Sequence, residues 1–279
     1  MEPRTFAEPT FRIPRADGSI AAVTRLWSGT AVALATLFDD DGGLAADATA
    51  QHAARLVEAG VRAVLVNGST GEAAALTDEE RVELLRAVRQ ACPDVPILAG
   101  ASGEWWQPAA ERAAAAVEAG ADGILVAPPR AGADLAVYFG RVVDAVGAAP
   151  VLAYHYPPTA GGPVPVEQLG SLPVQGIKDS SGEADRLVRE LELPGWSGSV
   201  YSGSAMLTAY AAALGAAGVI LAAANLAPED CVAAWGGDMA AQRRLLSTHL
   251  ICRDRFPYGM KAAMARRYGT PLTARLGPR

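Results

Sequence analysis

The chain has 279 residues, of which 51% are hydrophobic and 19% charged, and this composition excludes an intrinsically disordered protein. A net charge of −6 argues against nucleic acid or an anionic membrane surface as the main partner. The three cysteines and three histidines are scattered without metal-ligand spacing, so we expect reduced thiols and no metal site. The sequence shows neither a signal-peptide core nor an apolar run of membrane length, so we expect a cytoplasmic protein.

Regular structure is expected only after an N-terminal extension. Residues 1–25 contain three prolines and no sustained hydrophobic period, so we expect residues 1–28 to form an irregular arm. From residue 29, short β-type runs alternate with amphipathic stretches. The expected strands are Thr30–Thr36, Arg62–Asn67, Pro96–Gly100, Gly123–Ala127, Pro150–Tyr154, Val174–Lys178, Ser199–Ser202 and Gly218–Leu221.

The stretches between these strands have the spacing of helices. The expected helices are Asp47–Ala59, Asp78–Ala91, Gln107–Ala119, Leu135–Val146, Glu183–Leu191 and Ala205–Leu214. Thr77 and Glu80 form a capping-box pattern at the start of the second helix. Repeated strand–helix units of about 25–30 residues predict an α/β fold, a parallel (β/α)8 TIM barrel over residues 29–236. The absence of G-x-G-x-x-G after the first strand disfavours a dinucleotide fold.

A C-terminal helical region is expected over residues 237–279. Met239–Arg255 and Pro257–Tyr268 are its candidate helices. We expect these extra helices to cover one side of the barrel or to build an oligomer contact, and the sequence leaves both possibilities open.

Lysine is rare in this chain. Only Lys178 and Lys261 occur, beside 22 arginines. Lys178 stands at the end of an expected buried strand, where a desolvated lysine can lose its proton and attack a carbonyl, which arginine does not do. The alternative is a lysine that extends its ammonium to the barrel mouth. Lys261 lies on an expected C-terminal helix, and we expect no chemical role for it.

Three further strand ends carry candidate site residues, and in TIM barrels the reacting groups come from these ends. Gly68, Ser69 and Thr70 begin a tight loop whose N–H and hydroxyl groups can hold a carboxylate, or which merely caps the next helix. Tyr154 can transfer protons at the mouth, or merely pack there. Gly203 follows the seventh strand and leaves room for a ligand.

Together these groups suit one chemistry. The lysine amine can form a Schiff base with a 2-oxo acid, the loop can hold the carboxylate of that acid, and the tyrosine can move protons during formation of the imine. A protonated imine is an electron sink, so the neighbouring carbon can make or break a C–C bond.

Three motifs resemble those of the dihydrodipicolinate synthase/N-acetylneuraminate lyase family of pyruvate-dependent class I aldolases. Gly68–Glu72 resembles the G-T/S-T-G-E loop, Tyr154–Pro157 resembles Y-N-x-P, and Gly176–Gly182 resembles the lysine motif G-x-K-D/E-x-S/T-G. The resemblance extends from about Gly29 to Leu272. It implies a homo-oligomer, a tetramer or a dimer, that needs neither a metal nor an organic cofactor because the imine with Lys178 is covalent.

The resemblance also implies roles for individual residues. Lys178 would form the Schiff base, Tyr154 would be the acid/base, and Ser69 would relay protons. Thr70 would bind the substrate carboxylate together with Ser69. Gly203 and Ile220 fall at positions that line the pyruvate site.

The sequence departs from this family at several positions. Thr159 stands where dihydrodipicolinate synthases usually carry an arginine, which disfavours lysine biosynthesis. The loop with Trp105 and Trp106 lacks the tyrosine that is usually donated across a subunit interface, and His155 replaces the usual asparagine. The imine chemistry is expected to survive these changes.

The second substrate is expected to contact loop residues that follow the strands. Arg130 can bind a distal carboxylate, or it is a solvated rim charge. His155 and Tyr156 follow Tyr154, and Trp105 and Trp106 follow the third strand.

Four functions remain open. The first is an aldolase or lyase that makes or breaks a 4-hydroxy-2-oxo acid from pyruvate, or a related 2-oxo acid, and an aldehyde. The second is a sugar-acid dehydratase or hydratase that uses the same imine. The third is dihydrodipicolinate synthase itself. The fourth, a non-catalytic barrel that binds a 2-oxo acid, is disfavoured because a pure binder needs neither Lys178 nor Tyr154.

Overall fold

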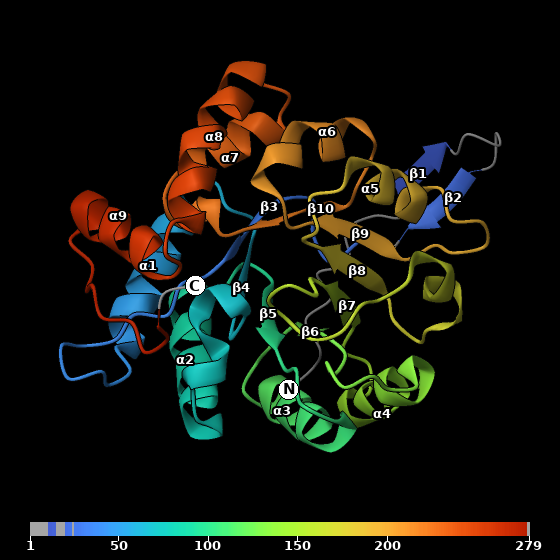
Figure 1. The fold of residues 1–279 in the computed structure, drawn as a ribbon, viewed down its shortest axis with the longest axis horizontal. Coiled ribbons are helices and arrows are strands. Elements are labelled where there is room, and N and C mark those ends of the chain that lie inside the picture. Colours follow the sequence, from blue (N-terminus) through green and yellow to red (C-terminus); the bar gives the residue numbers. More distant parts are fainter. Residues whose placement is uncertain (1–10, 15–19, 24, 278–279) are drawn as a thin grey trace.

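A closed parallel barrel forms the centre of the protein (Figure 1). The computed structural model describes residues 11–14, 20–23 and 25–277. Within these residues, eight strands follow the order β10-β3-β4-β5-β6-β7-β8-β9, and β10 closes the ring by pairing in parallel with β3. The predicted TIM barrel is therefore confirmed. The strands are β3 Gly29–Ala33, β4 Ala63–Val66, β5 Ile97–Gly100, β6 Gly123–Val126, β7 Val151–His155, β8 Gly176–Asp179, β9 Ser199–Ser202 and β10 Gly218–Leu221.

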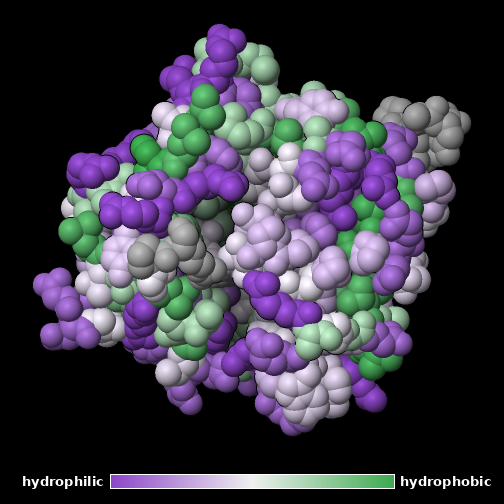
Figure 2. Space-filling view, viewed as in Figure 1, coloured by the Kyte–Doolittle hydropathy of each residue, from purple (hydrophilic) through white to green (hydrophobic). Residues whose placement is uncertain are grey.

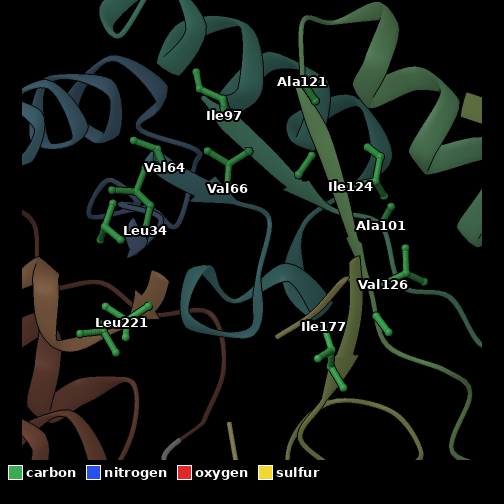
Figure 3. Close-up of a cluster of buried hydrophobic side chains, with 14 of the residues drawn as sticks. Leu34, Val64, Val66, Ile97, Ala101, Ala121, Ile124, Val126, Ile177 and Leu221 are labelled. Carbon is green, nitrogen blue, oxygen red and sulfur yellow. The ribbon is translucent and has the colours of Figure 1, made fainter. Parts of the chain in front are cut away.

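Alternate residues of the barrel strands belong to two separate hydrophobic clusters. Side chains such as Val64, Val66 and Ile124 face outward and fill the space between the strands and the helices (Figure 3). Their neighbours Leu65 and Leu125 belong to a second cluster, inside the barrel. Because the interior is filled by side chains in this way, a ligand can enter only at the strand ends.

Helices surround the barrel. They are α1 Ala46–Glu58, α2 Asp78–Ala91, α3 Trp106–Glu118, α4 Leu135–Val146, α5 Ala184–Leu191, α6 Thr208–Ala213, α7 Pro228–Trp235, α8 Met239–Arg253 and α9 Tyr258–Tyr268. The capping box of α2 is present, since the Thr77 hydroxyl accepts from the Glu80 N–H and the Thr77 N–H donates to the Glu80 carboxylate. The sequence did not predict α7, and the first turn of the expected helix Ala205–Leu214 is a 3-10 turn, Ala205–Leu207.

The N-terminal arm is not wholly irregular. Two short strands, β1 Phe11–Pro14 and β2 Ile20–Val23, pair antiparallel as a hairpin at the edge of the molecule (Figure 1). The prediction of an irregular segment is wrong for these residues, because runs of four residues are too short to show a strand period. The limits of the three predicted segments, 1–28, 29–236 and 237–279, stay predictions.

The C-terminal helices lie beside the barrel, where α8 packs against α7 and α9 packs against α8 (Figure 1). A third hydrophobic cluster joins them to the segment that follows β3, with Ala35 and Leu37 on one side and Cys252, Met260 and Met264 on the other. These helices therefore cover one side of the barrel, which is the first of the two arrangements that the sequence left open. No helix in the described part of the chain is long and apolar enough to cross a membrane.

Candidate active site

Lys178 and Tyr154 lie side by side at the carboxyl ends of neighbouring strands. Tyr154 on β7 and Lys178 on β8 are register partners in the parallel ladder. The Lys178 Nζ lies 4.5 Å from the centre of the Tyr154 ring. Both side chains are buried, with Lys178 only 4% exposed.

Burial makes Lys178 an unusual lysine. Desolvation lowers the pKa of its amine from 10.5 to about 7. No carboxylate of the described residues forms an ion pair with it to oppose this shift. A large share of the amine is therefore neutral near pH 7, which is the form that attacks a carbonyl.

The Tyr154 hydroxyl is held between two serine hydroxyls. Burial raises the pKa of Tyr154 to about 12, while hydrogen bonds from Ser180 and Ser69 act in the opposite direction. The phenol is therefore protonated at neutral pH and can donate a proton, and the serines offer a path by which it is replaced. Sequence reasoning assigned Ser69 but missed Ser180, although Ser180 stands two residues after Lys178 in the same motif.

The Gly68–Glu72 loop faces this pair. Ser69–Gly71 forms a single 3-10 turn that follows β4. A side chain at residue 71 would collide with the Thr36 hydroxyl at 2.8 Å and the Leu34 carbonyl at 2.9 Å, so glycine is required for the close approach. The turn brings Ser69 and Thr70 to the same cavity as Lys178.

Glu72, which ends the loop, is fully buried and pairs with Lys261. Its second carboxylate oxygen accepts the backbone N–H groups of Arg275 and Leu276, at 2.9 and 2.8 Å. The Lys261 ammonium also donates to the Thr273 carbonyl, at 2.6 Å. Lys261 is therefore no ordinary surface lysine, since it joins the loop, α9 and the C-terminal tail.

A cavity of about 530 Å³ opens above Lys178. Six of the predicted site residues line it, and they come from β4, β7, β8, β9 and β10 or the turns after them. These six are Lys178, Tyr154, Ser69, Thr70, Gly203 and Ile220. Figure 2 shows that the face of the molecule in that view is hollowed near its centre.

Gly68 and Arg130 lie on a neighbouring cavity of about 380 Å³ instead. Ser69, Tyr154 and Thr159 line both cavities, so the two are adjacent. The Arg130 guanidinium donates to the Pro157 carbonyl at 3.1 Å. The structure thus does not bring Arg130 to the cavity that contains Lys178.

His155 does not reach either cavity. Its Nδ1 accepts the backbone N–H of Val164 at 3.0 Å, and burial followed by the charge of Arg186 lowers its pKa to about 4. Successive residues of a strand face opposite sides, so a Tyr154 that faces inward places His155 outward. The position of His155 therefore argues against the predicted contact with substrate.

Four residues that sequence reasoning missed complete the wall of the cavity. They come from α8 and the segment after it, namely His249, Cys252, Arg253 and Phe256. Tyr156 also lines the cavity, whereas the exposed Trp105 and Trp106 do not. Within the described residues, no group of three or more His, Cys, Asp or Glu side chains could hold a metal ion.

The family model of the dihydrodipicolinate synthetase family matches residues 26–248, which is most of the chain. The chain belongs to this family. The family is thus the one that the three motifs predicted, and the chain is a lyase of the class I aldolase type.

Curated relatives support the same assignment. The chain is 32% identical over 232 residues to a 4-hydroxy-tetrahydrodipicolinate synthase of Natronomonas pharaonis, a match that covers 78% of this chain and 79% of the relative. It is 34% identical over 257 residues to an uncharacterized DapA-like lyase of Halobacterium salinarum, which covers 86% and 84%.

Solved structures of family members share the whole barrel. A prophage protein of Escherichia coli from the dihydrodipicolinic acid synthase family, in complex with pyruvate, superposes with a TM-score of 0.83 at 26% identity, over 91% of this chain and 93% of that one. A putative dihydrodipicolinate synthetase of Pseudomonas aeruginosa gives 0.82 at 27% identity, over 90% and 94%.

Proposed function

We propose that the protein forms an imine between Lys178 and pyruvate, or a related 2-oxo acid, and uses it to make or break a C–C bond. One observation carries the proposal: a desolvated lysine with its pKa lowered to about 7 lies without a carboxylate partner, among the described residues, in a cavity of about 530 Å³. Burial of this kind is costly, so it favours a functional amine. A solved relative is in complex with pyruvate, which supports the choice of substrate.

The 2-oxo acid is held by the loop after β4. The hydroxyl groups of Ser69 and Thr70 and the backbone N–H groups of this turn would bind its carboxylate. Gly203 allows Ser180 to take its place beside Tyr154, since a side chain at residue 203 would lie 1.9 Å from the Ser180 hydroxyl. Ile220 supplies an apolar wall.

The chemistry follows from these positions. The neutral Lys178 amine adds to the C2 carbonyl, and the carbinolamine loses its hydroxyl as water when Tyr154 donates a proton. The Tyr154 phenolate then takes a proton from C3 of the protonated imine, which gives an enamine. C3 of the enamine attacks the aldehyde carbon while Tyr154 returns the proton to the aldehyde oxygen, and water hydrolyses the resulting imine to release a 4-hydroxy-2-oxo acid. In the opposite direction the C3–C4 bond breaks and the aldehyde leaves. Water then releases the 2-oxo acid and regenerates the amine.

Among the aldolase activities of the family, that of dihydrodipicolinate synthase itself is disfavoured because of Thr159. This residue lines the cavity at the position where the resemblance leads us to expect an arginine. The imine itself acts as the electron sink, so we propose no further cofactor. By resemblance to the family we also propose a cytoplasmic homo-oligomer.

Borohydride trapping tests this function directly. The protein is incubated with pyruvate, the imine is reduced, and the labelled peptide is identified by mass spectrometry. We expect the adduct on Lys178, while Lys261 serves as the internal control because the chain has no third lysine. Failure to trap any 2-oxo acid on Lys178 contradicts the proposal. Conversion of a sugar acid without release of free pyruvate would instead support the dehydratase.

A further inference from the structure

The tail that follows α9, residues 270–277, is bonded to the loop that faces Lys178. The chain runs back from α9 to α2 in this tail (Figure 1). The backbone N–H groups of Arg275 and Leu276 donate to one carboxylate oxygen of Glu72, at 2.9 and 2.8 Å, and Lys261 pairs with the other oxygen at 2.5 Å. Both oxygens of this loop residue are therefore bound by groups from the C-terminal part of the chain.

The backbone of Glu72 has a conformation that needs such contacts. Its φ of 54° and ψ of 38° lie in the left-handed region, which a residue with a side chain keeps only where its surroundings hold it. Glu72 ends the 3-10 turn Ser69–Gly71 and precedes a second one, Ala73–Ala75. By binding the Glu72 carboxylate, the tail therefore fixes the point at which the chain leaves the first turn.

The Arg275 side chain fixes the segment that follows. Its guanidinium donates to the two carboxylate oxygens of Glu80, at 2.7 and 2.6 Å, and to the carbonyls of Ala75 at 2.9 Å and Gly42 at 2.7 Å. Glu80 belongs to the capping box of α2, and Ala75 ends the second 3-10 turn. One planar guanidinium thus joins the tail to α2, to the second turn and to the loop after β3.

The residues of this network do not line the cavity that contains Lys178. Ser69 and Thr70 line it, whereas Glu72, Glu80 and Arg275 do not. The tail can therefore act on the substrate only through the position of the Ser69–Gly71 turn.

We propose that the C-terminal tail is a positioning element for binding of the 2-oxo acid: through Arg275 and Glu72 it keeps the Ser69–Gly71 turn in the geometry that binds the substrate carboxylate. This inference rests on the proposed imine chemistry and adds the part of the chain that sets the affinity for the 2-oxo acid. A turn that has its binding geometry for only a fraction of the time binds more weakly by that fraction. Lys178 is held by β8 instead, so its reactivity at saturating substrate should not depend on the tail.

Borohydride trapping on Lys178 tests the inference with pyruvate and with methyl pyruvate, which lacks the charged carboxylate. Arg275→Gln should lower the trapping rate at low pyruvate roughly tenfold, while the rates at saturating pyruvate and with methyl pyruvate change less than about twofold. Glu80→Gln should act in the same direction, and the double variant should match Arg275→Gln because both changes remove the same contact. Glu80→Gln is the milder change and carries the test if Arg275→Gln does not fold.

Arg267→Gln is the matched control, because Arg267 lies on α9 but bonds to Glu229 and to the Leu226 carbonyl instead of the loop. This variant should trap pyruvate as the wild type does. Circular dichroism checks that each variant is folded under the trapping conditions. Unchanged trapping at low pyruvate in the folded variants overturns the inference, and so does an equal loss with pyruvate and methyl pyruvate. If the wild type traps no 2-oxo acid, the proposed function fails and this inference fails with it.

Discussion

The two lysines of this chain are both buried, and their surroundings differ in one respect. Lys261 is 0% exposed, and its ammonium pairs with the buried carboxylate of Glu72. Lys178 is 4% exposed, and no described carboxylate pairs with it. Burial lowers the pKa of both amines, but Glu72 opposes the shift at Lys261 alone.

The comparison shows how burial gives one lysine a structural role and the other a chemical role. An ammonium that is paired and hydrogen-bonded stays charged and joins segments of the chain, whereas an unpaired one tends to lose its proton. The two sites are also connected. Glu72 directly follows the turn that carries Ser69 and Thr70, so the Lys261 ion pair anchors the loop that faces Lys178.

The largest effect is expected when the unpaired lysine is removed. Lys178→Ala should lower turnover at least about 10⁴-fold, because no other described residue of the cavity can form the imine. Steady-state rates and the loss of borohydride trapping measure this effect. Lys178→Arg places a permanent cation without a nucleophilic amine at this position and should be equally inactive. Substantial activity in either folded variant would contradict the imine mechanism.

Tyr154→Phe is expected to give the next largest effect. Loss of the hydroxyl removes the proton donor, so turnover should fall about 10²- to 10⁴-fold while slow trapping on Lys178 persists. Tyr201→Phe is the matched control. Tyr201 is buried in the same barrel and its pKa is also raised to about 12, but it stacks on Trp27 and does not line the cavity. If Tyr154→Phe and Tyr201→Phe lower turnover equally, the assignment of Tyr154 as the acid/base is wrong.

The sequence predicted the barrel, and the meeting of the candidate site residues at its mouth, for a physical reason. Each barrel strand is a short apolar run with helical stretches around it, and strand ends converge at one mouth. Lys178, Tyr154 and Ser69 could therefore be expected together. The same reasoning could have placed His155 correctly, since the residue after an inward Tyr154 must face outward.

Contacts between distant segments could not be predicted in this way. Nothing in the pattern around Lys261 shows that Glu72 lies opposite it, because a helix that follows the barrel can pack on any of its sides. The same holds for Arg253, whose place in the cavity depends on how α8 packs against the segments after β9 and β10. Both contacts are results of tertiary packing.

Removal of the paired lysine should cost stability instead of chemistry. Lys261→Met leaves the Glu72 carboxylate buried without its cation, which should lower the free energy of unfolding by about 3–5 kcal/mol. Denaturant unfolding measures this loss, and Lys261→Met/Glu72→Gln should recover part of it. Arg244→Gln, which breaks the exposed pair with Asp230, should cost less than about 1 kcal/mol. A small loss in Lys261→Met would show that the buried pair does not hold the tail.

The smallest expected effect is a dependence of the imine-forming rate and of stability on pH, and it comes from Lys178. The initial rate of imine formation should rise about tenfold between pH 6 and pH 8, because the Lys178 amine loses its proton near pH 7. Stability should change in the same direction. The pKa of Lys178 is lower in the folded than in the unfolded chain, so the unfolded chain binds more protons between about pH 7 and 10.5, and stability increases with pH across that window.

Lys178→Met should remove this contribution, so the variant should be more stable than wild type at pH 7 and the difference should shrink toward pH 10. Urea unfolding at several pH values measures it, with Tyr154→Phe as a control that keeps the lysine. If the rate of imine formation rises only above pH 9, the pKa of Lys178 is that of a solvated surface lysine. The contrast between an unpaired and a paired buried lysine would then not explain the chemistry.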